Sequence, residues 1–492
     1  MFAKVKRLLL ENYGVRQTVV KNTFWLSVSN VGGRLIRMLI IMYAARVLGA
    51  SEWGAFSYSM AIIAFLTILV DFGINNVATQ ELSRNNSDKP VLISTIFRIK
   101  IVLLSLIVLG TVVFVPHLTK IESARAVLPI LALVMAMDAL RDFGFSIIRS
   151  EEKMEKEALL FVLTNIAIVG FGFLTLYLSP TAESFAYAYA AGGGLGTIFT
   201  GIALRSYWKY LTVKINLSRI KKIFSRAWPF GLSSLLGGMM VNTDVVILGW
   251  LKTSEAVGYY SSSQRIILLL YIIPGILASS IFPVISRLAR KDDEKVGRVL
   301  SASLRFIWLV SLPIMMGGVI LADNLIGFFF GAEYLPGVMA FRILVLSLGV
   351  NFSGMILASI IFVYNRHKEL IIYSALGGVT NVILDLILIP RWGIEGSAFA
   401  TSMVQVMTTI YIWNRASKDV HFPIGKYLPK MFGATAVMGI LVFLMKMWLV
   451  PVIPLIFACG LIYFLVLYLL KEPLLMEAKE VMLDTGRQNS VP

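Results

Sequence analysis

The sequence predicts an all-α, polytopic membrane protein with about 14 transmembrane helices. Three observations lead to this fold class: a strongly apolar composition, recurring apolar runs, and basic residues that gather in alternate connections. Of the 492 residues, 58% are hydrophobic and 15% are charged, and the mean hydropathy is +0.80. A soluble domain carries about 25% charged residues. This chain therefore needs a bilayer to cover its apolar surface.

The apolar runs set the positions of the predicted helices. A transmembrane helix needs about 20 predominantly apolar residues, and runs of this length are separated here by short polar connections. A membrane β-barrel would show shorter segments in which polarity alternates at every second residue. The fourteen predicted spans are 24–45, 57–77, 94–115, 126–148, 158–178, 185–204, 228–250, 259–283, 301–322, 338–363, 370–389, 397–414, 431–449 and 454–470.

Charge placement predicts the orientation. The connections after odd-numbered spans carry five basic residues, whereas the termini and the other connections carry 31 of the 45 Lys and Arg. Because cytoplasmic loops are enriched in Lys and Arg, we expect both termini to be cytoplasmic and the protein to lie in the cytoplasmic (inner) membrane. The net charge of +17 then reflects loops that face anionic lipid, and no nucleic-acid partner is expected.

The longest connection divides the spans into two groups. Residues 205–227 contain seven basic residues interleaved with aromatic and aliphatic ones, which predicts a cytoplasmic amphipathic linker on the membrane surface. It separates an N-terminal lobe of six spans (1–204) from a C-terminal lobe of six spans (228–414). Residues 415–492 hold spans 13 and 14 and a cytoplasmic tail.

Two turns indicate that the lobes are duplicates. Residues 48–57 (LGASEWGAFS) follow span 1, and residues 251–261 (LKTSEAVGYYS) follow span 7. Both contain Ser-Glu, then Gly, then aromatic residues and Ser. Repeated multi-helix halves around a central site are a common transporter design. We therefore predict two related six-helix lobes with a C-terminal helix pair added.

Several segments resemble a known family. These are 46–54 (RVLGASEWG), 244–249 (DVVILG) with Gly258, 330–334 (FGAEY) and 381–402 (NVILDLILIPRWGIEGSAFATS). In this order and spacing they resemble polysaccharide transporters of the multidrug/oligosaccharidyl-lipid/polysaccharide exporter superfamily, above all the O-antigen flippase (Wzx-type) branch.

The resemblance implies a function. Members are similar in having two lobes around a cavity that opens alternately to each side of the membrane. It implies that the chain is a flippase, not an enzyme, and that it moves a polyprenyl-diphosphate-linked oligosaccharide across the cytoplasmic membrane for cell-surface polysaccharide synthesis. The implied partners are a lipid-linked anionic glycan, membrane lipids and other polysaccharide-assembly proteins.

Three alternatives stay open. One is a multidrug or cation exporter of the same superfamily, and another is a lipid II-type flippase. The third is a membrane enzyme such as a glycan polymerase, which would need large extracytoplasmic loops that the predicted spans do not leave. An exporter of cations would need an acidic or aromatic cavity.

Span 1 offers the clearest substrate site. An ionisable group inside a span is costly and indicates function. At 100° per residue, the polar side chains of this span fall within a stripe of roughly 80°. A guanidinium stays charged and binds paired oxygens, which suits a diphosphate. The predicted binding residues of the stripe are Arg34, Arg37, Asn30 and Ser27, with Thr23 on the same face. The alternative is that a buried carboxylate such as Asp71 neutralises the arginines.

Other charged residues within spans complete the candidates. Arg265, in span 8, is a further predicted substrate ligand, although its position near a span end also suits snorkelling to the interface. A second group is open to two roles, ion coupling by proton or sodium and internal pairing: Asp71, Asp244, Asp138, Arg141 and Asp142. The three histidines lack metal-ligand spacing and no phosphate-binding GxxxxGK[ST] motif occurs, so neither a metal nor a cofactor is expected.

Overall fold

The computed structural model describes residues 11–12, 14–84, 88–214, 217–448 and 450–473. Every regular element within these ranges is a helix, which confirms the predicted all-α class. The basic segment 1–10 and the tail from 474, both expected on the cytoplasmic side, lie outside the described residues, as do positions 215–216 of the predicted linker.

The helices are long enough to cross a membrane. Ten helices qualify by length and composition, or eleven if the bent pair 332–346 and 348–363 is one span. Two of them contain a non-helical glycine: Gly49 in α2 (Gly14–Asp71) and Gly393 in α15 (His367–Ala416). Each glycine lies in a predicted outer turn, so each of these helices covers two predicted spans. The chain is therefore a multi-span membrane protein, while the count of fourteen stays a prediction.

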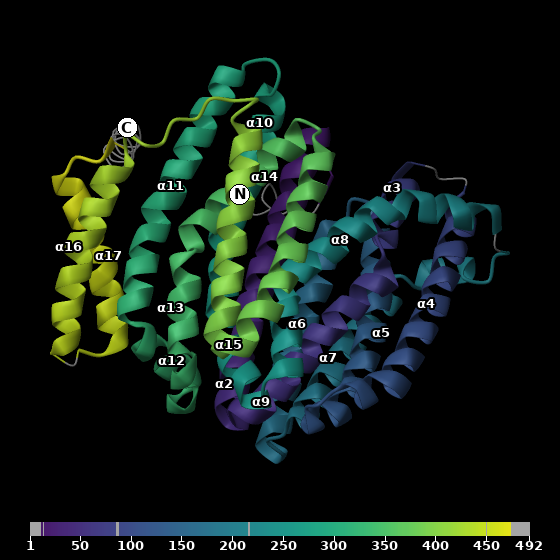
Figure 1. Ribbon diagram of the computed structural model, residues 1–492. Helices are drawn as coiled ribbons and strands as arrows, with labels where there is room; N and C mark the ends of the chain where they lie inside the picture. The colour runs from purple at the N-terminus through teal and green to yellow at the C-terminus, as the bar shows by residue number, and fades with distance from the viewer. Residues whose placement is uncertain (1–10, 13, 85–87, 215–216, 449, 474–492) are drawn as a thin grey trace, which may run out of the picture. The chain divides into compact units, whose positions relative to one another are not determined.

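Both glycines have backbone angles that favour glycine. Gly49 has φ 74° and Gly393 has φ 58°, in the left-handed region where a Cβ atom would be strained. The ribbon of α2 descends from the N-terminal end and turns back at this break (Figure 1). A glycine at each outer turn thus allows two apolar helices to follow one another with almost no loop.

Packing divides the chain into two compact units, of which the first comprises residues 1–261 and 378–394. In it α2 packs against α5, α6, α7 and α8, and α5 packs against α3, α4 and α7. Its other helices, in chain order, are α3 (Ile74–Arg84), α4 (Lys89–Leu118), α5 (Glu122–Ser150), α6 (Met154–Leu178), α7 (Ala182–Ala203), η1 (Arg205–Tyr210), α8 (Leu217–Leu251) and the start of α9 (Ser254–Leu270).

Small residues bring the helices of this unit together. A Cβ atom on Gly192 would lie 2.5 Å from the side chain of Ile168, and one on Gly196 would lie 2.2 Å from Thr164. Both glycines are on α7 and both partners are on α6. The glycine-rich run of span 6 is thus a helix-packing surface, as glycine-rich faces commonly are in membrane helices.

The two turns with similar sequence lie against each other. The hydroxyl of Ser254 donates to the carbonyl of Ser51 at 2.6 Å. A Cβ atom on Gly54 would lie 1.8 Å from the Ser254 carbonyl oxygen, and one on Gly258 would lie 2.1 Å from the Ala50 carbonyl oxygen. Each turn therefore places its glycine against the backbone of the other, in a reciprocal arrangement.

The second compact unit comprises residues 262–377 and 395–492. In it α11 packs against α10, α13, α14 and α16, and α16 packs against α17. Its helices beyond α9 and α15 are α10 (Ile272–Leu288), α11 (Asp293–Ile320), α12 (Ala322–Phe330), η2 (Ala332–Gly337), α13 (Val338–Leu346), α14 (Leu348–Val363), α16 (Leu428–Met447) and α17 (Val452–Leu469).

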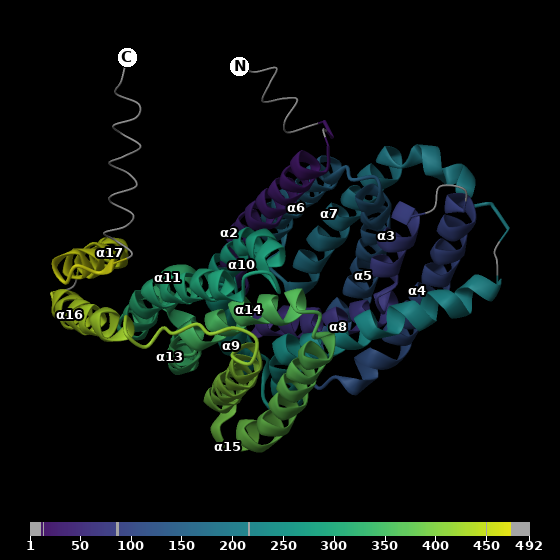
Figure 2. The ribbon, with the colours of Figure 1, turned by 90° about the horizontal axis from the view of Figure 1, so that it is seen from above.

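The boundaries of the two compact units, which are defined by packing, differ from those of the predicted lobes. Helix α8 begins at Leu217 and runs without interruption into predicted span 7. It belongs to the first unit, where it lies beside α3 and α4 (Figure 2). The end of the predicted linker 205–227 and span 7 are thus one helix. The division into lobes at 1–204, 205–227, 228–414 and 415–492 stays a prediction.

Candidate functional site

The predicted polar stripe of span 1 lies on α2. Thr23, Asn30 and Arg34 are exposed, and Ser27 and Arg37 are partly buried. The side-chain amide of Asn30 donates to the carbonyl of Leu26, one turn earlier, at 2.7 Å. The stripe therefore presents hydroxyl, amide and guanidinium groups along one side of a membrane helix.

The same helix has a second exposed face of opposite character. Phe24, Val28, Leu35 and Leu39 are 45%, 47%, 50% and 63% exposed. At 100° per residue they lie at least 60° from the polar stripe. An apolar exposed face suits lipid, whereas two arginines inside a span need water or an anion. The two faces thus indicate two different environments along one helix.

Arg37 is held in place by two helices. Its Nε atom donates to the Oδ1 atom of Asn165 on α6 at 2.9 Å, and its guanidinium carbon lies 5.8 Å from the ring centroid of Tyr189 on α7. Asn165 is itself fixed, because its amide donates to the carbonyl of Phe161 at 2.8 Å. Among the described residues, neither terminal nitrogen of Arg37 forms a hydrogen bond or an ion pair, so the side chain is oriented through Nε while its fork stays available.

A glycine sets the distance between α2 and α6. A Cβ atom on Gly33 would lie 2.5 Å from the ring of Phe161 and 3.1 Å from the amide nitrogen of Asn165. This close approach brings Asn165 within reach of Arg37. The next residue, Arg34, is exposed, and no carboxylate among the described residues of the first unit forms an ion pair with it.

The charged row of α5 is arranged differently. Arg141 is buried and pairs with two carboxylates, with Asp138 at 2.6 Å and with Asp142 at 3.0 Å. Its guanidinium also lies 5.5 Å from the ring of Phe145. Ion pairs thus join this trio, while its role, in ion coupling or in internal pairing alone, stays a prediction.

Asp71 pairs with a cation that the sequence analysis did not single out. Lys100 on α4 is fully buried, and its Nζ atom lies 2.9 Å from the Oδ1 atom of Asp71. The expected alternative, in which Asp71 neutralises Arg34 or Arg37, is not what the structure shows. The sequence did contain a signal for Lys100, because it is a charged residue within the apolar run of a predicted span.

Asp244 lies in a buried polar cluster of the first unit. It is fully buried and accepts a hydrogen bond from the hydroxyl of Tyr260 at 2.5 Å. Helix α8 contacts the 378–394 part of α15 above and below this point: a Cβ atom on Gly378 would lie 2.9 Å from the Leu236 carbonyl oxygen, and Lys252 donates to the Pro390 carbonyl at 3.3 Å.

These contacts place Asp385 of α15 at a similar depth to Asp244. Asp385 is fully buried, and Asn381, one turn earlier, is 1% exposed. Among the described residues, neither polar atom of the Asn381 side chain has a hydrogen-bond partner. A buried amide without a protein partner is unusual, which makes this position a candidate for a bound water or ion.

The remaining candidate, Arg265, belongs to the second unit, where it is partly buried on α9. Its participation in one site with the α2 stripe stays a prediction.

Sequence reasoning missed Asn165 and Tyr189 beside Arg37. A polar residue within span 5 was a usable signal for Asn165, whereas Tyr189 could not be told from a core aromatic. The described residues contain no group of three or more His, Cys, Asp or Glu that could hold a metal.

Comparison with known proteins identifies the family. The sequence pattern of the family described as polysaccharide biosynthesis protein matches residues 19–289, more than half of the chain. The chain belongs to this family. This match, together with the relatives named below, confirms the resemblance to polysaccharide transporters that the short motifs indicate.

Named relatives agree with this assignment. A probable low-salt glycan biosynthesis flippase of Haloferax volcanii is 26% identical over 407 residues, which cover 80% of this chain and 82% of the relative. A putative O-antigen transporter of Shigella flexneri is 23% identical over 418 residues, which cover 80% of this chain and 97% of the relative.

The fold has a counterpart among solved structures. The structure of lipid II flippase MurJ in an inward closed conformation aligns with a TM-score of 0.78 at 18% sequence identity, and covers 91% of this chain and 99% of that protein. At this identity the likeness shows a shared fold. The polytopic helical architecture expected from the sequence is thus that of a known transporter.

Proposed function

We propose that this chain is a flippase that moves a polyprenyl-diphosphate-linked oligosaccharide across the cytoplasmic membrane for cell-surface polysaccharide synthesis. The observation that carries the proposal is Arg34. It is an exposed guanidinium inside a membrane-spanning helix, without a carboxylate partner among the described residues of its unit. Family membership and the names of the relatives support the same reading.

The side chains of the α2 stripe match the separate chemical groups of such a cargo. The diphosphate carries adjacent anionic oxygens, which the forks of Arg34 and Arg37 can bind in pairs. Hydroxyl and amide groups at Thr23, Ser27 and Asn30 match sugar hydroxyls. The lipid tail is apolar and needs no protein cavity, because it can stay in hydrocarbon while the head group moves. Asn165 orients Arg37, which lowers the cost of ordering that side chain on binding.

The proposed orientation places both termini in the cytoplasm. It rests on the excess of Lys and Arg in alternate connections. The glycan would be collected on the cytoplasmic side and released on the outer side as the two predicted lobes open alternately. Other polysaccharide-assembly proteins are expected to supply and use the cargo.

We further propose that coupling, if ion-driven, uses a cation at Asp244 rather than at Asp71. Asp71 is already neutralised by Lys100. Asp244 lies instead beside the α15 segment that contains Asp385 and the amide of Asn381, which lacks a hydrogen-bond partner. Carboxylate and amide oxygens suit hard cations such as sodium. Replacing Asp244 by Asn should remove sodium dependence of transport, and unchanged sodium dependence would contradict this assignment.

Cells can test the main proposal. Arg34→Ala combined with Arg37→Ala, and the corresponding double change to Glu, should abolish surface polysaccharide while the protein still inserts into the membrane at normal amounts. Normal surface polysaccharide in both double variants would reject the stripe as the binding site.

The exporter alternative makes the opposite prediction. A drug or cation exporter of the same superfamily would gain rather than lose transport when the arginines of the stripe are replaced by Glu. Efflux of cationic dyes by the wild-type chain in a resistance assay would favour that alternative. A lipid II-type flippase would be distinguished by its glycan, using the two lipid-linked precursors as competing substrates.

A further inference from the structure

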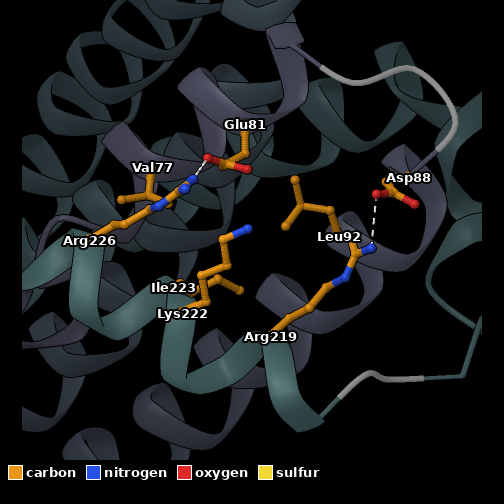
Figure 3. A pocket seen from close by; sticks show the side chains of 8 residues that line it. All are labelled: Val77, Glu81, Asp88, Leu92, Arg219, Lys222, Ile223 and Arg226. Atoms are coloured by element: carbon orange, nitrogen blue, oxygen red, sulfur yellow. Dashed lines mark hydrogen bonds and ion pairs between the residues drawn. The ribbon is translucent and has the colours of Figure 1, made fainter.

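Ion pairs join helices in the first unit. In the pocket between α3, α4 and α8, Arg226 pairs with Glu81, and Arg219 pairs with Asp88 at 2.9 Å (Figure 3). Each pair fixes one position of α8 to the α3–α4 corner. The second unit uses neutral hydrogen bonds for a similar purpose, at a place where two helices are broken. Such bonds are weaker than those between charged groups, and they suit contacts that change during a cycle.

Two membrane helices of the second unit are interrupted part-way along their length. The break between α9 and α10 falls at Tyr271, although the two helices together form one candidate span. The break between α13 and α14 falls at Ser347, where the two segments bend by 45°. Each break is a position where the span can bend, because the regular ladder of backbone hydrogen bonds is interrupted there.

The local sequence explains both breaks. Pro274, at the start of α10, has no backbone N–H, so it cannot donate to the carbonyl of Leu270 one turn earlier. Ser347 and Gly349 lie two residues apart at the other break, and Gly and Ser together are a common cause of helix kinks. The chain is thus built to bend at Tyr271 and at Ser347.

One face of α15 follows the break between α13 and α14. The backbone N–H of Ser347 donates to the carbonyl of Leu344 rather than to that of Ile343. The hydroxyl of Ser402 on α15 donates to the Ile343 carbonyl at 3.3 Å and so supplies the missing partner. Two turns along the same face, Thr409 donates to a carbonyl of α14 at 3.2 Å. Side chains of α15 thus satisfy backbone groups that hydrocarbon could not.

Gln405 lies between these two residues and connects both breaks. Its Oε1 atom accepts from the hydroxyl of Ser347 at 2.6 Å, and its Nε2 atom donates to the hydroxyl of Tyr271 at 3.2 Å. Either orientation of the amide keeps both links, because each hydroxyl can donate or accept. Gln405 and Ser347 are 8% and 5% exposed, so little water competes for these bonds. One side chain therefore joins the bending points of two spans.

The helix segments on each side of the breaks are paired as well. After the breaks, α10 packs against α14, and the ring centroids of Phe282 and Phe362 lie 5.9 Å apart. Before the breaks, the hydroxyl of Ser263 on α9 donates to the carbonyl of Gly337, which precedes α13, at 2.9 Å. The two spans thus consist of two paired segments that meet at the level of Gln405.

We propose that α10 and α14 bend as one body about Tyr271 and Ser347 during transport, and that Gln405 is the positioning residue that keeps the two bends in step. The inference rests on the proposed function for the cycle in which this motion is used, because alternating access requires parts of a lobe to change position. It does not depend on the identity of the glycan. Since the two bends share one partner, a change at either break reaches the other through Gln405.

Matched controls lie on the same face of α15. Ser402 and Thr409 each serve the α13–α14 span alone, whereas Gln405 also reaches Tyr271. Ser402→Ala and Thr409→Val therefore remove one neutral hydrogen bond to this span, as Gln405→Leu does, but leave the link between the breaks intact. A role in satisfying backbone or hydroxyl groups alone would make all three variants behave alike.

Distances between spin labels on the full chain in vesicles test the coupling. Labels replace Ser286 near the end of α10, Val363 at the end of α14 and Met339 near the start of α13, which are all at least partly exposed. In the wild-type background we expect a broad distribution for Met339–Val363, which reports the bend, and a narrow one for Ser286–Val363, which reports the pairing. Gln405→Leu should broaden the Ser286–Val363 distribution.

The variants of the two hydroxyl groups sharpen this test. Tyr271→Phe should broaden the Ser286–Val363 distribution as Gln405→Leu does, and the two changes together should add nothing further, because both cut the same link. An unchanged distribution in Gln405→Leu would overturn the proposal, and so would equal broadening in Ser402→Ala. A wild-type Met339–Val363 distribution as narrow as that of two labels within α11 would also overturn it, without any variant that has to fold.

Transport provides a second measurement. Gln405→Leu should lower the maximal rate of glycan transport about fivefold, as for the loss of one neutral hydrogen bond, with an unchanged apparent affinity for the lipid-linked cargo. A loss of affinity at an unchanged rate would place Gln405 in the cargo site and contradict its role between the breaks. The distance measurements need no cargo, so absence of glycan transport by the wild-type chain would reject the proposed function and leave the paired bend supported.

Discussion

The polar stripe of α2 and the charged residues of α5 (Asp138, Arg141 and Asp142) both contain arginine. The arginines differ in whether carboxylates neutralise them. Both place arginines within membrane-spanning helices of the first unit. Arg141 on α5 is buried between Asp138 and Asp142, and its charge is satisfied inside the protein. Arg34 on α2 is exposed and lacks such a partner in its unit, and Arg37 is held by an amide and an aromatic ring.

The difference shows how a charged membrane residue can be assigned. A guanidinium with two carboxylates is part of the scaffold, because its removal leaves two anions inside the membrane region. A guanidinium oriented by neutral groups keeps its charge available for a ligand. The number of carboxylate partners, rather than burial in a span alone, therefore separates structural from binding arginines in this protein.

The largest loss of stability is expected when Arg141 is replaced. Arg141→Ala leaves Asp138 and Asp142 without their cation, and the free energy of unfolding should fall by about 3 kcal/mol. The side chains of the two aspartates are 36% and 46% exposed, which places the loss at the lower end of the range for buried pairs. Thermal unfolding in detergent measures it, and the triple change with Asp138→Asn and Asp142→Asn should restore much of the stability.

Arg34 should show the reverse pattern. The Arg34 side chain forms no hydrogen bond or ion pair with any described residue, so Arg34→Ala should change the free energy of unfolding by no more than about 0.5 kcal/mol. Transport should nevertheless fall about thirtyfold, because a charge-assisted hydrogen bond to the cargo is worth about 2 kcal/mol. A variant that lost stability while keeping transport would place Arg34 in the scaffold with Arg141.

Asn165 should have a smaller effect through Arg37. Asn165→Ala removes the group that orients Arg37 but keeps its charge, and we expect the apparent affinity for the lipid-linked cargo to weaken about fivefold, as for a neutral hydrogen bond of about 1 kcal/mol. Asn165→Asp supplies another acceptor to Arg37 but adds a negative charge. It should preserve the side-chain orientation and still reduce binding, which separates orientation from charge.

Arg34→Lys should have the smallest effect. Lysine keeps the positive charge but loses the planar fork that binds two oxygens at once. Transport should fall by a few-fold only, less than for Arg34→Ala measured in the same vesicles. Equal losses for Lys and Ala would mean that the charge alone is insufficient and that the fork is essential.

Much of this architecture follows from the sequence, because the bilayer imposes simple rules. Apolar runs predict helices, and the helical period places Thr23 to Arg37 on one face. The pairing of the charged residues was less accessible. Lys100 was visible as a charged residue within an apolar run, but its pairing with Asp71 became apparent only once α2 and α4 were packed together.

Other features depend on contacts between distant segments. The orientation of Arg37 comes from Asn165 and Tyr189, which lie 128 and 152 positions away along the chain. The reciprocal contact of Gly54 and Gly258 with the opposite turns was hidden in two similar peptides whose sequences show likeness but not proximity. Similarity predicted a repeat, and packing shows that these repeated turns meet.

Transport by purified protein in vesicles tests the central claim most directly. A fluorescent polyprenyl-linked glycan is supplied in two forms, one with its diphosphate and one in which a neutral linker replaces it, and the fraction reaching the opposite leaflet is followed with time. The proposed role of Arg34 and Arg37 predicts that the wild-type chain moves only the diphosphate form and that the double Ala variant, folded and inserted, moves neither. Equal movement of the neutral form by the wild type, or of the diphosphate form by the double variant, would contradict it.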